Sequence, residues 1–103
     1  MRQFDVYPNP DSRERLPYLI VLQSDLLERL DNVVVAPLRS QQDGKSIPIL
    51  GLNPVVEVGA ERHFVRIQAP AAIPARSLRQ PVCNLSSERE ALLAALNLLF
   101  TGL

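Results

Sequence analysis

Several residue types are scarce in this chain. Its 103 residues include no tryptophan, one cysteine and one histidine, and aromatic residues make up 5% of the total. The single cysteine, Cys83, cannot form a disulfide within the chain, and no spacing of cysteine and histidine resembles a zinc site. We therefore expect a reducing, cytoplasmic location and neither a bound metal nor a cofactor.

The chain has no excess of charge of either sign, because eleven Lys and Arg balance eleven Asp and Glu. Without a net positive field, nucleic acid is not the default partner. The first residues lack the apolar run of a signal peptide. The uncharged residues 91–103 are fewer than the roughly 20 apolar residues of a membrane span. We expect a soluble protein without membrane contact.

The remaining composition is that of a small globular protein. Apolar residues make up 47% of the chain and charged residues 21%, which is too apolar for a disordered chain. The length predicts a single domain over residues 1–103. A chain of this size buries only about two-thirds of its unfolded surface, so dimerisation would supplement a thin core.

Nine prolines, none beyond Pro81, divide most of the chain into short runs typical of strands. Predicted strands cover residues 3–7, 18–22 and 33–36, and a hairpin joins 55–58 to 62–68 through Gly59-Ala60-Glu61. The continuous apolar runs 18–22 and 33–36 indicate strands buried on both faces. We also expect a helical turn at 26–30, a mobile connection at 39–46, and a linker or edge strand at the proline-containing 69–74.

The last twenty residues predict a helix. Ser87 and Glu90 match a capping box, in which each side chain bonds a free backbone N–H at the helix start. Leu92, Leu96, Leu99 and Leu103 form one apolar stripe, yet Leu93, Ala94, Leu98 and Phe100 cover the other faces. A helix that is apolar all round must be covered all round, whereas a small sheet hides about half of it. Burial of the remaining apolar surface would contribute several kcal/mol at about 25 cal/mol per Å². The pattern therefore predicts that this surface is buried against another chain.

Five segments in order carry a resemblance to a known family. They are QFDVY at 3–7, VLQSDLL at 21–27, VAPL at 35–38, PVV at 54–56 and NLLFTGL at 97–103. Together they resemble the CcdB family, the toxins of plasmid-addiction modules, over nearly the whole chain. The resemblance implies a mainly β, SH3-like, partly open antiparallel barrel of the CcdB and MazF type with a C-terminal α-helix. It also implies a symmetric homodimer.

The resemblance further implies a function without catalysis. Toxins of this family bind the A subunit of DNA gyrase and trap the enzyme on cleaved DNA, and a CcdA antitoxin neutralises them through a disordered C-terminal segment. Contact with DNA would be indirect, through gyrase or the antitoxin complex. Carried over by position, the gyrase-binding residues are Ser24, Leu26, Leu27, Asn97, Phe100, Thr101, Gly102 and Leu103.

The chain end suits docking but departs from the family pattern. Gly102 can adopt a positive φ after the helix, and Leu103 ends the chain with an apolar side chain. Many family members end in Trp-Gly-Ile, whereas this chain has Thr101 at the tryptophan position. Loss of an aromatic anchor costs roughly 2 to 4 kcal/mol of binding unless another contact compensates. Val21 and Arg89 also replace acidic residues of the family.

Two other functions compete with gyrase poisoning. A MazF-like mRNA endonuclease shares the barrel and would have to use Arg13, Arg15 and His63, although the neutral charge counts against RNA binding. An inactive toxin-like subunit that only binds the antitoxin is consistent with the missing tryptophan.

Structural roles compete with functional ones at several positions. His63 is expected to be a structural residue of its strand, and Cys83 a small, buried or half-buried residue rather than a nucleophile. The charged residues 13–15 are typical of a solvated turn. Asp25 could cap the turn at Leu26, and Asn97 needs a hydrogen-bond partner in the fold, the dimer or the target.

Overall fold

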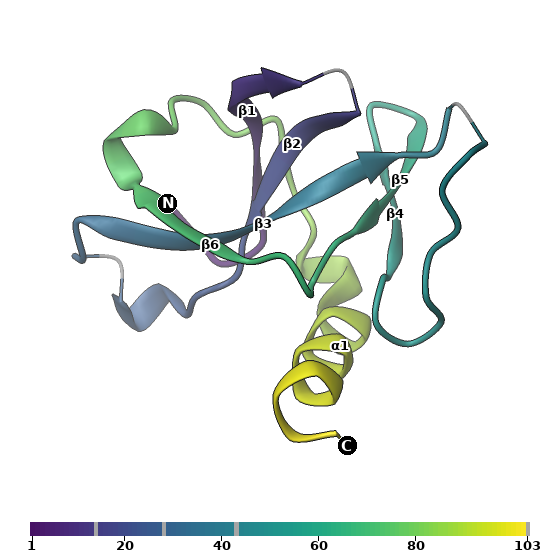
Figure 1. Ribbon diagram of the computed structural model, residues 1–103. Coiled ribbons are helices and arrows are strands. Elements are labelled where there is room, and N and C mark those ends of the chain that lie inside the picture. Colours follow the sequence, from purple (N-terminus) through teal and green to yellow (C-terminus); the bar gives the residue numbers. More distant parts are fainter. Residues whose placement is uncertain (14, 28, 43, 103) are drawn as a thin grey trace.

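The chain forms one antiparallel sheet that curls into a nearly closed barrel, with a helix at its C-terminal end (Figure 1). The computed structural model describes residues 1–13, 15–27, 29–42 and 44–102. The strands are β1 (Asp5–Arg13), β2 (Leu16–Val21), β3 (Asn32–Ser40), β4 (Val55–Val58), β5 (Glu61–Val65), β6 (Ala71–Pro74) and β7 (Cys83–Asn84). Single 3-10 turns are η1 (Asp25–Leu27), η2 (Ala75–Ser77) and η3 (Ser86–Glu88), and the α-helix is α1 (Arg89–Thr101). The expected mainly β barrel with a C-terminal helix is confirmed.

The long strand β3 organises the sheet. The strand order is β4-β5-β3-β2-β1-β7, and β6 also pairs with β3. One edge of β3 pairs with β2, while its other edge is shared by β6, along residues 32–35, and β5, along residues 38–40. Figure 1 shows β6 and β5 following one another along β3. The two parts of the sheet are therefore joined through a single strand.

The sheet has an apolar cluster on each face. The inner cluster lies between the barrel and α1 and contains Phe4, Val6, Ile20, Leu22, Ala36, Leu38, Val56, Val58, Val65, Ile67, Leu85, Leu92 and Ala95. The outer cluster contains Tyr7, Leu19, Val21, Val33, Val35 and Leu78. Consecutive strand residues point to opposite faces, so β1 and β2 contribute to both clusters. Burial on both faces, which the apolar runs predicted, is confirmed except at the exposed Val34.

The observed strand boundaries differ from the predicted ones near prolines, at which a predicted strand ends. β1 continues past Pro8 and Pro10 to Arg13, because its pairing with β2 shifts register between Pro8 and Arg13 and tolerates the missing donors. The hairpin of β4 and β5 turns at Gly59 and Ala60 as expected. The segment around Pro70 and Pro74 is the edge strand β6. The expected connection at 39–46 begins later, since Arg39 and Ser40 belong to β3.

The capping box predicted at Ser87 and Glu90 is wrong. The turn η3 precedes α1, and neither N-cap residue, Leu85 for η3 or Glu88 for α1, forms a side-chain cap. A backbone bond and a local side-chain bond replace it: the Glu88 N–H donates to the Leu85 carbonyl at 2.9 Å, and the Ser86 N–H donates to Asn84 Oδ1 at 2.8 Å. The Asn84 amide in turn donates to Asp5 Oδ1 at 2.9 Å. The helix start is therefore fixed by β1 and β7. Within the described ranges, no helix is long and apolar enough to cross a membrane.

The inner cluster predicts a large effect of truncating Leu92, which is fully buried on α1. We expect Leu92→Ala to lower the free energy of unfolding by about 2 to 5 kcal/mol, because it removes apolar contacts and leaves a cavity. Denaturant unfolding measures the change. Leu50→Ala is the matched control, since Leu50 is 98% exposed, and it should change stability by less than about 0.5 kcal/mol. Equal losses in both variants would contradict this core.

Candidate target-binding face

Helix α1 buries one side and exposes the other near its end. Leu92 and Ala95 are buried, and half-buried leucines of the same helix also pack on the inner cluster. Leu98 is exposed, and Phe100 is 72% exposed. A single chain thus leaves apolar surface uncovered on the last turns of α1, as the sequence pattern predicted.

The helix ends in a left-handed glycine cap. Gly102 has a φ of 75°, and its N–H donates to the Leu98 carbonyl at 3.1 Å. The Thr101 hydroxyl donates to the Asn97 carbonyl at 2.7 Å, so this side chain folds back onto the helix. Asn97 itself is exposed, so water can satisfy its side-chain amide. The predicted contact residue Leu103 lies outside the described residues.

A second apolar patch surrounds η1. Leu26 is 92% exposed, and Leu27 and Leu30 are exposed beside it. The Ser24 hydroxyl accepts the Leu26 N–H at 3.2 Å, so Ser24 rather than the expected Asp25 caps this turn. The Asp25 carboxylate instead accepts the Gln3 N–H. The turn is also shorter than the predicted helical turn at 26–30.

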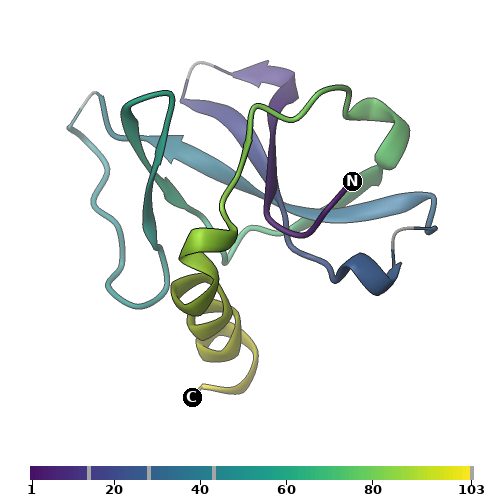
Figure 2. The same ribbon diagram turned by 180° about the vertical axis from the view of Figure 1, so that it is seen from behind.

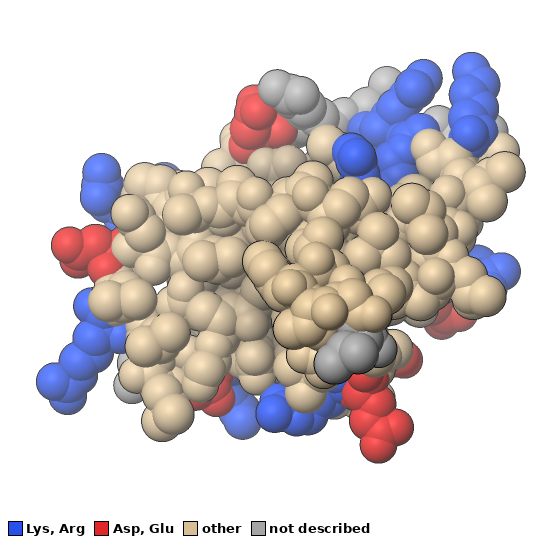
Figure 3. Space-filling view, turned by 60° about the horizontal axis from the view of Figure 1, so that its bottom comes forward, with Lys and Arg blue, Asp and Glu red and all other residues tan. Residues whose placement is uncertain are grey.

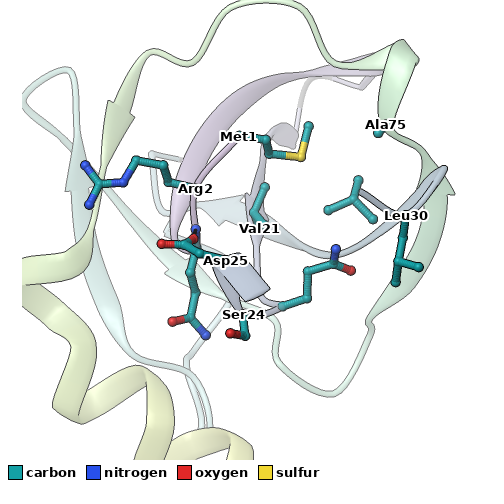
Figure 4. A pocket seen from close by; sticks show the side chains of 10 residues that line it. Met1, Arg2, Val21, Ser24, Asp25, Leu30 and Ala75 are labelled. Carbon is teal, nitrogen blue, oxygen red and sulfur yellow. Dashed lines mark hydrogen bonds between the residues drawn. The ribbon is translucent and has the colours of Figure 1, made fainter. Parts of the chain in front are cut away.

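Side-chain hydrogen bonds of neighbouring residues fix the position of the η1 loop. Gln23 Oε1 accepts the Val34 N–H at 3.0 Å, and Gln3 Nε2 donates to the Leu22 carbonyl at 3.0 Å. Figure 4 shows the space between this loop, the N-terminus and Ala75. Its volume of about 10 Å³ holds at most one water, so it is a packing contact and not a ligand site.

The two patches lie on the same side of the barrel but on separate elements. Figures 1 and 2 both show η1 to one side of α1, level with the first turns of the helix, while the C-terminal end of the helix extends beyond it. Figure 3 shows this side from below: charged side chains lie around the rim, and the centre is free of them. Within one chain, the predicted contact residues therefore form two separate surfaces and not one pocket.

The sequence interpretation missed a third exposed apolar segment. Ile47, Ile49 and Leu50 are exposed in the connection between β3 and β4. This connection reaches α1, because a Cβ at Gly51 would lie 3.7 Å from Leu98 Cδ2. The run Ile-Pro-Ile-Leu at 47–50 was the available signal, but the predicted connection ended at Ser46.

His63 is buried and lies within the fold. Its ring meets Tyr18 edge-on at a centroid distance of 5.4 Å, and Nδ1 lies 3.0 Å from the Glu61 carbonyl oxygen. With Nδ1 protonated it donates to that carbonyl, which supports the structural role. Cys83 is half-buried in β7, as expected. No group of three metal-ligating side chains occurs among residues 1–102 outside the three undescribed positions.

The fold occurs in solved toxin structures. The Mycobacterium tuberculosis toxin MazF-mt6 matches with a TM-score of 0.71 and 22% identity over 96% of this chain and 96% of that chain. A crystal structure of an Mtb toxin matches with a TM-score of 0.68 and 22% identity over 81% of this chain and 91% of that one. The architecture is therefore that of small barrel toxins.

The family follows from the sequence match. The family model described as "CcdB protein" matches residues 3–102. This chain belongs to the CcdB family, whose members are toxins of toxin–antitoxin modules. Comparison with curated proteins gives no match.

Burial near β1 predicts a loss of stability at alkaline pH. Burial raises the pKa of Tyr7 and of the Cys83 thiol, and the Asp5 carboxylate raises both further. The folded state therefore holds these two protons more tightly than the unfolded state does. Their contribution to the free energy of unfolding is complete below the ordinary pKa values of 9.0 for the thiol and 10.0 for the phenol. It is lost as the pH rises through the higher pKa values of the folded state.

We expect the free energy of unfolding to fall as the pH is raised from 8 through about 11. Denaturant unfolding at several pH values measures this fall. The double variant Tyr7→Phe and Cys83→Ala should show a shallower decline, because neither new side chain ionises. Parallel declines in the two proteins would show that other groups cause the loss.

Proposed function

We propose that this CcdB-family protein is a non-enzymatic poison of DNA gyrase. It binds the A subunit of gyrase through the exposed end of α1 and blocks resealing of cleaved DNA. One observation carries the proposal: the apolar surface that the barrel leaves uncovered is at the positions where the family binds its target. Phe100, the one aromatic residue of α1, is 72% exposed there.

Phe100 takes the role of the missing tryptophan in this proposal. Thr101 bonds back to the Asn97 carbonyl and offers little apolar area. An exposed phenylalanine on a rigid helix is an anchor of the kind that dominates interface energies. Leu26 and Leu27 on η1 supply additional apolar contacts, and Gly102 allows the target backbone to approach closely.

The active form in this proposal is a symmetric homodimer. A second copy covers part of the apolar surface around Leu98 and brings two α1 ends to one side. The resulting twofold surface matches the twofold symmetry of gyrase. A CcdA-like antitoxin then neutralises the toxin by covering the same end.

The endonuclease alternative has less support. His63, its candidate general base, is buried under Tyr18 and cannot reach an RNA strand. The balanced charge provides no electrostatic attraction to RNA.

A gyrase cleavage assay with purified protein tests the proposal. We expect the wild-type chain to accumulate cleaved DNA. Phe100→Ala should weaken this effect at least roughly 10-fold, because truncating a central aromatic anchor costs about 2 kcal/mol or more. Deleting residues 101–103 should abolish it, since the docking end is lost while the core contacts of α1 remain.

The control is Val82→Ala, which truncates an exposed apolar side chain on the segment before β7. It should poison gyrase as the wild type does. Full poisoning by both the Phe100→Ala and the truncated protein would exclude α1 as the binding element. RNA cleavage by the wild type would favour the endonuclease.

Sedimentation at micromolar concentration tests the dimer. We expect a species of twice the 11.5 kDa chain mass. Leu98→Asp should shift it toward the monomer, because an unpaired carboxylate in an apolar interface is costly to desolvate. The same substitution at the remote Ala72, an exposed residue of β6, serves as a control for added charge if it leaves the dimer intact. A monomer at all concentrations would contradict the dimer.

A further inference from the structure

The sheet begins and ends in two strands that leave an opening in the barrel. Among the described residues, β4 pairs only with β5, and β7 pairs only with β1. A groove of about 450 Å³ lies at this opening, and we call it the seam groove. Figures 1 and 2 both show the hairpin of β4 and β5 beside the start of α1. The lining residues come from this hairpin and from the segment between β7 and α1: Val55, Val56, Glu57, Arg62, Leu85, Ser87 and Glu88.

The hydrogen bonds of β5 alternate between its two neighbours. The Arg62 carbonyl accepts the N–H of Gln41, the residue after β3, at 3.1 Å. The Val65 N–H instead donates to the carbonyl of Pro54, the residue before β4, at 3.0 Å. In an antiparallel sheet, alternate residues of a strand bond to opposite neighbours. Residues 61, 63 and 65 therefore bond toward β4, and residues 62 and 64 bond toward β3.

This alternation leaves backbone groups of β4 pointing out of the sheet. Val56 and Val58 are opposite residues 63 and 61, so their N–H and C=O groups bond to β5. Val55 and Glu57 are opposite residues 64 and 62, so their N–H and C=O groups point to the free edge. Both residues are exposed, and no described residue outside the sheet bonds to their backbone. The edge of β4 can therefore accept a further strand.

The seam groove is acidic on its rim and apolar on its inner wall. Glu57 and Glu88 contribute carboxylates, against the guanidinium of Arg62. Neither carboxylate forms a hydrogen bond or an ion pair with a described residue. On the inner wall, Val56 and Leu85 are buried members of the inner cluster. Because side chains of a strand alternate between faces, an added strand would meet acidic groups with one set of its residues and apolar groups with the other.

A second copy of this chain fits this edge less well than a different partner. Two β4 strands related by a twofold axis at Val56 would place Val55 of each chain opposite Glu57 of the other. Each carboxylate would then lie beside an apolar side chain and have no basic partner across the strands. The carboxylates of the rim also repel a phosphate backbone. The charges of the groove therefore favour a basic polypeptide segment.

We propose that the free edge of β4 binds an extended segment of a partner protein in which Lys or Arg alternates with apolar residues. The segment adds to the sheet as an antiparallel strand, so that backbone bonds supply affinity and the side chains supply specificity. Its basic residues lie opposite Val55 and Glu57 and place a positive charge beside the Glu57 carboxylate. Its apolar residue opposite Val56 packs toward Leu85. This site is separate from the end of α1 and does not depend on gyrase binding.

Amide hydrogen exchange, followed by NMR on the full chain, tests this site. The probe is a short synthetic peptide in which valine and lysine alternate, and the comparison peptide carries glutamate in place of lysine. With the lysine peptide about 10 times above its Kd, exchange at the Val55 and Glu57 amides should slow roughly 10-fold, because it then proceeds from the free protein. The Val56 and Val58 amides, which already bond to β5, should change less. The glutamate peptide should bind more weakly.

Methylation of the peptide nitrogens separates strand addition from simple charge attraction. In the proposed register the lysine N–H groups face β4, and the valine N–H groups face away. N-methyl groups on the lysines should weaken binding by at least roughly 10-fold, because the backbone donors are lost. N-methyl groups on the valines should change the affinity by less than about 2-fold, since those donors face solvent.

Val55→Pro tests the same bonds from the side of the protein. It removes the outward N–H at the first residue of an edge strand, where a sheet tolerates proline, and should weaken peptide binding by at least roughly 10-fold. Val55→Thr keeps the N–H and is its control. Glu57→Gln should weaken binding of the lysine peptide by roughly 3-fold, because an exposed ion pair is lost. Asp31→Asn removes the same charge from an exposed residue that does not line the groove, and should change binding by less than about 2-fold.

The methylated peptides carry the test on the wild-type chain if Val55→Pro fails to fold. Three results would overturn the proposal: equal binding of the two methylated peptides, binding of the glutamate peptide as tight as that of the lysine peptide, or unchanged exchange at Val55 and Glu57. Slower exchange of these two amides at high protein concentration without peptide would also overturn it, because it would assign the edge to a second copy.

Discussion

The packing of α1 against the inner cluster is the constraint on which the rest of the molecule depends. Leu92 and Ala95 complete a core that the curled sheet cannot close alone. A barrel can cover only one side of a helix, while this helix is apolar on nearly every side. The same sequence that secures the core therefore leaves Phe100 in water. Apolar surface of this kind costs free energy until a second protein covers it.

The two apolar patches are linked through the N-terminus. Gln3 donates its backbone N–H to the Asp25 carboxylate in η1 and its side-chain amide to the Leu22 carbonyl, and its Oε1 accepts from Arg89 at 3.0 Å. One residue thus connects the η1 loop to the start of α1. Arg89, at a position where the family has an acidic residue, therefore has a structural use in this chain.

The sequence predicted the features that depend on neighbouring residues better than those that depend on contacts between distant segments. The strands, the hairpin at Gly59 and the over-apolar helix follow from patterns within a few residues, and the structure confirms them. The capping box failed because Asn84 and the Leu85 carbonyl, fixed by β1 and β7, satisfy the helix start instead. The pairing of Arg39 with Phe64 was missed because these residues meet only through the register of β3 with β5, which no single-sequence pattern encodes.

The connection between β3 and β4 lies next to the helix. Gly51, in this connection, has a φ of 83°, a conformation that favours glycine, and approaches Leu98 on α1. The exposed Ile47, Ile49 and Leu50 precede Gly51, so a protein that covers Leu98 would also lie beside the apolar surface of this connection. Because one apolar surface cannot hold two proteins at once, a second copy and a target that both need Leu98 would compete for it without any change in the fold.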